Sequence, residues 1–188
     1  MRKRVVAFSS TPRKEGNSDI LVNHVLKGAG ELAAETEKIR VHDLAIRPCT
    51  ACGVCQKSVE TPCVIKDDMA SLVAKIRQAD GLVMASPIYF CSVNGQMKVF
   101  LDRLYALFGG GGFDALRGKR AALVFTYGDK DPLSSGVMNG LRLFQDAFYA
   151  LGVQMTGWVQ VSCLDAGEVR QNHHALEEAR LLGRKLME

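Results

Sequence analysis

Hydrophobic and polar positions divide this chain into alternating strand and helix patterns. Three short stretches, residues 5–8, 82–85 and 121–125, are apolar at nearly every position. Such runs are typical of strands covered by helices on both faces. Residues 36–41 and 154–161 instead alternate between apolar and polar side chains, which is typical of edge strands with one face less well covered. We therefore predict three central strands and two edge strands.

Helical patterns lie between these strands. Apolar residues recur every three or four positions in four stretches, at 21–32, 97–108, 137–151 and 175–186. A shorter helix is expected at 68–78. Regular alternation of strand and helix predicts an α/β fold with a doubly wound parallel sheet. With the second and fifth strands at the edges, the five strands take the order 2-1-3-4-5, and ligands bind where the order reverses, between strands one and three.

Three segments interrupt this alternation. Residues 43–67 form an insertion with four cysteines, residues 109–112 are consecutive glycines, and residues 127–133 are mostly polar. We expect the glycines to form a flexible surface loop. No linker divides the chain, so residues 1–188 are predicted to form a single domain.

Composition limits the partners and the cellular location that we predict. The chain has 188 residues, 47% of them hydrophobic and 23% charged, and a formal net charge of +4. No apolar run reaches the ~18 residues of a membrane span, and the basic residues are scattered, so we predict neither a membrane nor a nucleic-acid partner. Because only four apolar residues follow the basic N-terminus, we expect no signal peptide and a cytoplasmic protein. Six cysteines in a cytoplasmic protein indicate metal, redox or catalytic use rather than disulfides.

A hydroxyl-rich loop follows the first strand. Residues 9–18 read Ser-Ser-Thr-Pro-Arg-Lys-Glu-Gly-Asn-Ser and precede a helical pattern. The N–H groups and dipole at a helix N-terminus attract anions, and Ser9, Ser10, Thr11, Ser18, Asn17 and Arg13 supply donors for a phosphate group. The alternative is a surface turn in which Asn17 or Ser18 only caps the helix. The sequence of this loop alone does not distinguish a phosphate site from a surface turn.

A second loop, after the third strand, lies across the switch point from the first. It contains Pro87, Ile88, Tyr89 and Phe90, and its aromatic side chains indicate a planar ligand that stacks there. The alternative is that these residues begin the core packing of the next helix. Cys91, in the same loop, is interpreted as a core thiol.

These motifs resemble those of the NADPH-dependent FMN reductases. The resemblance rests on Thr11-Pro12-Arg13, Gly16-Asn17-Ser18, Pro87-Ile88-Tyr89-Phe90, Gly95-Gln96-Met97-Lys98 and Leu101-Asp102-Arg103. It implies a flavodoxin-like fold, noncovalent FMN, and a homodimer or homotetramer. The resemblance places Thr11, Arg13, Asn17 and Ser18 at the phosphate, where we also predict Ser9 of the same loop. It places Pro87, Ile88, Tyr89 and Phe90 along the ring, with Tyr127 and Gly128 beside it. Asp102 and Arg103 are expected to form structural or subunit ion pairs rather than catalytic contacts. The first loop lacks the Gly-x-Gly-x-x-Gly pattern of dinucleotide sites, which favours FMN over FAD or NAD.

Four cysteines in the insertion form a second candidate site. Cys49, Cys52, Cys55 and Cys63 have the spacing C-x2-C-x2-C-x7-C, which is related to ferredoxin ligand runs. The segment resembles that of the iron–sulfur flavoproteins, so we predict a 4Fe–4S cluster. A cluster-free loop is the first alternative, since similar FMN reductases carry a nearly identical segment, and zinc is the second.

Together these patterns predict an FMN-dependent oxidoreductase. NAD(P)H or a ferredoxin-like donor would reduce FMN, and electrons would pass to an acceptor such as flavin, quinone or an iron–sulfur protein, singly if a cluster lies nearby. The first alternative is a non-enzymatic electron carrier. The second is a zinc-stapled module that binds another anion in the first loop.

Overall fold

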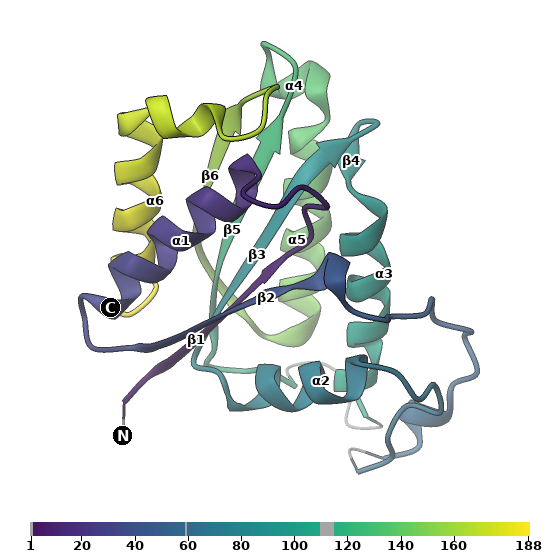
Figure 1. Ribbon diagram of the computed structural model, residues 1–188. Helices are drawn as coiled ribbons and strands as arrows, with labels where there is room; N and C mark the ends of the chain where they lie inside the picture. Colours follow the sequence, from purple (N-terminus) through teal and green to yellow (C-terminus); the bar gives the residue numbers. More distant parts are fainter. Residues whose placement is uncertain (1, 59, 110–114) are drawn as a thin grey trace.

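A twisted parallel sheet forms the centre of the molecule (Figure 1). The computed structural model describes residues 2–58, 60–109 and 115–188, so residues 110–112 of the glycine run lie outside the described residues. Five parallel strands lie in the order β2-β1-β3-β5-β6. They are β1 (Arg4–Ser9), β2 (Glu35–Arg40), β3 (Gly81–Tyr89), β5 (Arg120–Tyr127) and β6 (Gln154–Ser162).

The predicted order holds for these parallel strands, and the two alternating stretches are the edge strands β2 and β6. The prediction of five strands was wrong in one respect. A sixth, two-residue strand, β4 (Ser92–Val93), runs antiparallel to the end of β3. It was missed because the turn that joins it to β3 contains none of the residues that usually mark a hairpin.

Helices cover both faces of the sheet. In Figure 1, α1 (Asn17–Gly30) and α6 (His173–Lys185) lie together on one side, while α3 (Gly95–Arg103) and α5 (Val137–Leu151) lie on the other. The side of α3 and α5 is completed by α2 (Met69–Gln78). The remaining short helices are η1 (Val41–Asp43), η2 (Val54–Gln56), η3 (Leu104–Leu107), α4 (Pro132–Ser135) and η4 (Glu168–Gln171). None of the described helices is long and apolar enough to cross a membrane.

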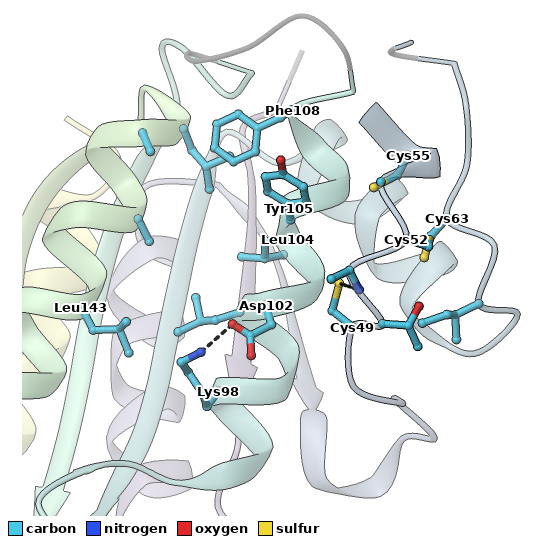
Figure 2. Close-up of a pocket in the computed structure, with 18 residues that line it drawn as sticks. Cys49, Cys52, Cys55, Cys63, Lys98, Asp102, Leu104, Tyr105, Phe108 and Leu143 are labelled. Carbon is cyan, nitrogen blue, oxygen red and sulfur yellow. Dashed lines mark hydrogen bonds and ion pairs between the residues drawn. The ribbon is translucent and has the colours of Figure 1, made fainter. Parts of the chain in front are cut away.

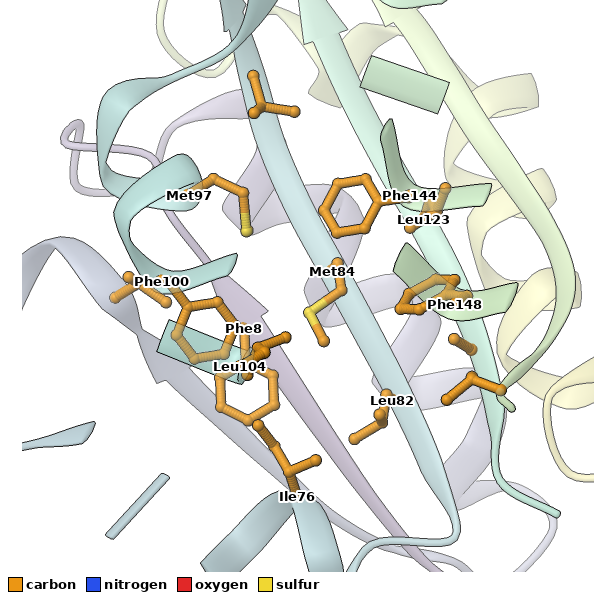
Figure 3. Close-up of a cluster of buried hydrophobic side chains, with 14 of the residues drawn as sticks. Phe8, Ile76, Leu82, Met84, Met97, Phe100, Leu104, Leu123, Phe144 and Phe148 are labelled. Carbon is orange, nitrogen blue, oxygen red and sulfur yellow. The ribbon is translucent and has the colours of Figure 1, made fainter. Parts of the chain in front are cut away.

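Strand β1 shows why both faces are covered. Successive side chains of a strand point to opposite faces. Val5 and Ala7 therefore pack with α1 and α6, whereas Val6 and Phe8 join the core on the side of α2, α3 and α5. In that larger core, shown in Figure 3, the Phe8 and Phe100 rings stack with centroids 4.9 Å apart. The buried strand fixes where the following loop leaves the sheet.

Two helix boundaries differ from the prediction. The helix expected over 97–108 ends as an α-helix at Arg103 and continues as the tighter turn η3. The polar loop expected at 127–133 ends in the short helix α4, which Asp131 caps through the backbone N–H groups of Leu133 and Ser134. A Pro at the first helical position favours that start.

Candidate functional site

A cavity of about 240 Å³ lies at the carboxyl ends of β1, β3 and β5. Its lining comes from the loops after these strands and from the segment after β6: Thr11, Arg13, Gly16, Asn17, Ser18, Pro87, Ile88, Tyr89, Thr126, Tyr127, Gly128, Cys163 and Leu164. All the predicted cofactor-binding residues except Ser9 and Phe90 line it. The structure therefore brings the three loops, far apart in the sequence, to one place.

The first loop presents the N-terminus of α1 to this cavity. The helix begins at Asn17, its N-cap position is Gly16, and no side chain of the described residues caps it. The turn is tight, since a Cβ on Gly16 would lie 2.9 Å from Thr11 Oγ1 and 3.0 Å from the Arg13 carbonyl. The alternative in which Asn17 or Ser18 caps the helix is therefore wrong. An uncapped helix N-terminus facing a cavity can hold an anionic group such as the FMN phosphate.

Polar side chains of this loop are tied to neighbouring segments. Arg13 donates to the carbonyl of Leu164 (3.0 Å), and Asn17 donates to that of Asp165 (2.8 Å). The Ser18 hydroxyl bonds the hydroxyl of Thr126 across 2.8 Å, which joins the first loop to the end of β5. These contacts orient the donors before any ligand is present.

Ser9 and Ser10 lie below the cavity rather than in it. Ser9 is fully buried and donates to Asp19 across 2.5 Å. The Ser10 hydroxyl donates to Asn94 Oδ1 (2.7 Å), and Asn94 returns a bond from its amide to the Ser10 carbonyl (2.8 Å). Asn94 also caps α3 by accepting from Met97 N–H. Sequence reasoning missed Asn94, although an Asn just before a helical pattern is a recognised N-cap signal.

The second loop is a hairpin with unusual backbone geometry. Ile88 and Tyr89 of β3 pair with Val93 and Ser92 of β4, which leaves Phe90 and Cys91 as a two-residue turn. Both turn residues have positive φ, 45° and 70°. Phe90 is fully exposed, and Cys91 is also exposed, so its interpretation as a core thiol was wrong.

That hairpin tip packs against the start of α5. The Cys91 carbonyl accepts from the Asn139 amide (2.9 Å), and a Cβ on Gly136 would lie 2.2 Å from the same carbonyl oxygen. Positive φ at two non-glycine residues costs energy and is retained where surrounding contacts enforce it, often at functional sites. The contacts with Asn139 and Gly136 thus hold the strained hairpin in place at the end of β3, where Ile88 and Tyr89 line the cavity.

Two weak acids beside the cavity are kept neutral. Burial raises the pKa of the Tyr127 hydroxyl, and burial also raises the pKa of the Cys163 thiol to about 11. The site therefore offers hydrogen-bonding groups and an apolar wall, without an assembled pair of acid and base side chains among the described residues lining it.

A larger cavity, of about 740 Å³, lies beside the cysteine segment. Cys49, Cys52, Cys55 and Cys63 all line it, together with apolar side chains of α3, η3 and α5. Figure 2 shows the cysteine segment alongside the helix that carries Leu104 and Tyr105, with Leu143 of α5 on the other side of that helix. The two cavities share no lining residue.

Thiol donors suit an iron–sulfur cluster or zinc, and N–H groups already donate hydrogen bonds to these sulfurs. Cys49 accepts from Ala51 N–H (3.4 Å), and Cys55 accepts from the Gln56 amide (3.3 Å). Across the residues that the structure describes, however, no three metal-ligating side chains are grouped closely enough to hold a metal ion. The donor chemistry therefore fits a thiolate-bound centre, whereas the sulfurs are not assembled around one.

Arg103 anchors this segment. Its guanidinium forms a two-pronged pair with the Asp67 carboxylate (2.6 and 3.1 Å), donates to the carbonyl of Arg47 (2.7 Å) and contacts Cys63 Sγ (3.5 Å). The expected structural ion pairs are confirmed, since Asp102 pairs with Lys98 on the same helix. Arg103 thus ties both ends of the cysteine segment to α3.

Comparison with known proteins gives the family. The model of the NADPH-dependent FMN reductase family matches residues 3–161. The chain belongs to this family. An iron–sulfur flavoprotein of Archaeoglobus fulgidus is 31% identical over 187 residues, which cover 98% of this chain and 79% of that protein.

Two further similarities bear on this chain. Iron–sulfur flavoprotein MJ1083 of Methanocaldococcus jannaschii is 38% identical over 100 residues, and the match spans 53% of this chain and about half (51%) of that relative. A solved flavodoxin from the domain Archaea superposes with a TM-score of 0.59 at 15% identity, covering 98% of this chain and 95% of that one, which supports the flavodoxin-like fold. Membership of the FMN reductase family is the ground for the activity proposed below.

Proposed function

We propose that this protein takes electrons from NAD(P)H through FMN bound in the cavity at the carboxyl ends of β1, β3 and β5. One observation carries the proposal: the uncapped N-terminus of α1 and the ends of β3 and β5 line the same cavity. Bound FMN supplies a ring that accepts a hydride and releases electrons to an acceptor. The chain's own task is to bind, orient and shield that cofactor.

Each loop has a separate part in this proposal. Arg13, Asn17, Ser18 and the first N–H groups of α1 hold the phosphate, since charge-assisted bonds to phosphate oxygens are strong. Pro87, Ile88 and Tyr89, with Phe90 at the strained hairpin tip, would lie along the ring, and Tyr127 and Gly128 would lie beside it. Ser9 would act from beneath the loop through Asp19. No side chain needs to act as a general acid or base.

The phosphate assignment is tested with Arg13→Ala. FMN binding to the full chain freed of flavin is followed by quenching of flavin fluorescence. The loss of a charge-assisted bond is expected to weaken binding about tenfold or more. Lys14→Ala is the matched control, because Lys14 is the adjacent cation, is exposed and does not line the cavity. Unchanged FMN affinity in Arg13→Ala would contradict the assignment.

The electron donor is tested separately. Anaerobic addition of NADPH or NADH should rapidly bleach the flavin absorption of the loaded protein, which stopped-flow absorption follows. Absence of bleaching, together with reduction by a low-potential ferredoxin, would instead favour the electron carrier. The observation that favours a non-enzymatic electron carrier as the second function is that four cysteines line one cavity.

We infer a thiolate-bound centre at Cys49, Cys52, Cys55 and Cys63, with a 4Fe–4S cluster as the preferred occupant. The shared cavity and the N–H groups directed at the sulfurs support it, as do the names of two relatives. Iron and sulfide assays on anaerobically purified protein should give about four of each per chain. Zinc, or neither metal nor sulfide, would contradict the cluster.

The remaining predictions concern the setting of this reaction. A single domain, a cytoplasmic location, a homodimer or homotetramer, and a small-molecule or redox-protein acceptor stay part of the proposal. Because the two cavities share no lining residue, a cluster would not lie within the FMN cavity itself. Light scattering on the purified protein tests the oligomer.

A further inference from the structure

Arg40, the last residue of β2, lies under the phosphate loop without lining the cavity. Arg40 pairs with Ser9 in the parallel register of β1 and β2. Because Ser9 is the last residue of β1, Arg40 lies beside the start of the phosphate loop. Its guanidinium forms an ion pair with Asp19 and donates to Asp43 across 2.8 Å. It also donates to the carbonyls of Thr11 (3.3 Å) and Arg13 (3.4 Å).

The contacts to the loop backbone hold its shape. The Thr11 carbonyl precedes Pro12, whose nitrogen has no hydrogen, so this peptide group can be stabilised only through its oxygen. Arg40 supplies that donor, and it also bonds the Arg13 carbonyl two residues further along the loop. Both carbonyl oxygens are thereby engaged by a cation. A carbonyl dipole turned toward a bound phosphate would repel it.

The ion pair with Asp19 removes a second repulsion. Asp19 lies in the first turn of α1, and its side chain is 2% exposed. An uncompensated carboxylate there would oppose the positive end of the helix dipole, to which a phosphate is drawn. Arg40 neutralises this charge without lining the cavity. Two independent contacts of one side chain therefore favour an anion at the same place.

We propose that Arg40 is a positioning residue that strengthens the preference of this site for a phosphorylated flavin over an unphosphorylated one, without touching the cofactor. This inference rests on the proposed FMN site. It extends that proposal by assigning the selectivity to a side chain outside the cavity. The chemical group discriminated is the terminal phosphate, since FMN and riboflavin share the ring and the ribityl chain.

The test compares FMN and riboflavin binding to the full chain freed of flavin. In Arg40→Met we expect FMN affinity to fall about tenfold and riboflavin affinity to stay within about twofold of the unsubstituted protein. A merely structural role would weaken both flavins equally. Lys38→Met is the matched control, because Lys38 lies two residues earlier on β2 and its ammonium donates to Asn23 Oδ1 (2.8 Å) at the surface, away from the loop backbone. It should leave both affinities unchanged.

Two further variants keep the test decisive. Arg40→Lys keeps the charge beside Asp19 but has fewer hydrogen-bond donors, so it should retain part of the preference for FMN over riboflavin. If Arg40→Met does not fold, Arg40→Lys replaces it in the test. Adding Asp19→Asn to Arg40→Met removes the uncompensated charge and should recover about threefold in FMN affinity. If Arg40→Met and Arg40→Lys both keep the full FMN-to-riboflavin ratio, or lower both affinities equally, the inference is wrong.

Failure of the inference is distinguishable from failure of the proposed function. If the unsubstituted protein binds FMN and riboflavin equally and Arg13→Ala changes neither affinity, the phosphate assignment itself fails. If Arg13→Ala abolishes the preference while the Arg40 variants keep it, only the role of Arg40 is refuted.

Discussion

Removing the carboxylate of Asp67 should strongly destabilise the protein. The Asp67 and Arg103 side chains are 3% and 1% exposed, and each oxygen of Asp67 accepts from the guanidinium. The Asp67→Asn variant leaves the Arg103 charge buried without its partner. Breaking a buried ion pair in this way costs about 3–5 kcal/mol in the free energy of unfolding.

Urea unfolding followed by circular dichroism measures this loss. With a slope m of ~2 kcal/mol/M, the unfolding midpoint should fall by about 2 M. Asp102→Asn is the matched control, because Asp102 is the neighbouring residue and pairs with Lys98 at the surface, where both side chains are about half exposed. Such a pair contributes only ~0–1 kcal/mol. Equal midpoints for the two variants would refute the reasoning.

The same pair predicts a pH dependence. Burial alone would raise the pKa of Asp67, but hydrogen bonds from Arg103 and from the backbone N–H groups of Arg47 and Met69 lower it overall. A carboxyl whose pKa is lower in the folded state stabilises the fold above the pKa of the unfolded chain, about 3.9. That contribution disappears as the pH falls through the folded pKa. The difference between the unsubstituted protein and Asp67→Asn should therefore shrink below about pH 4.

Three further perturbations have defined outcomes. Gly136→Ala should destabilise the protein by about 3 kcal/mol in urea unfolding, since Gly136 has φ of 86° and an added Cβ would clash with the Cys91 backbone. Replacing Phe90 and Cys91 by Asn and Gly should raise the melting temperature by about 2–4 °C, because those residues adopt positive φ more easily. In metal-free protein, iodoacetamide at pH 8 should label Cys52, whose pKa the backbone N–H of Val54 lowers, well before Cys163, whose pKa burial raises to about 11.

Each of these has a contradicting result. Gly95→Ala is the control for the glycine prediction, since nothing lies within 4 Å of its added Cβ; equal losses in the two glycine variants would show that the clash is not the cause. A lower melting temperature for the Asn-Gly hairpin would show that Phe90 contributes more by contact than it costs in strain. Comparable labelling of Cys52 and Cys163, read by mass spectrometry of peptides, would contradict the assigned burial.

Local patterns predicted the parts of the site that local chemistry controls. The hydroxyl-rich loop, the segment Pro87–Phe90 and the cysteine spacing are all visible in short stretches of sequence. The hairpin was missed because Phe90 and Cys91 are not turn residues, and their backbone conformation depends on the packing of Cys91 against Gly136. Asn94 and Arg40 were missed because their partners lie 84 and 21 to 29 residues away.

The alternation of strands and helices, the edge and central strands, and the chemical character of each loop follow from short stretches of sequence, because hydrophobic periodicity and turn chemistry act between near neighbours. Which side chains meet depends on how the strands and helices pack. The parallel register sets Arg40 beside the end of β1, the crossing of α3 beneath the cysteine segment buries Arg103 against Asp67, and the strand ends converge on one cavity. Those outcomes depend on long-range packing, which no short stretch of sequence contains.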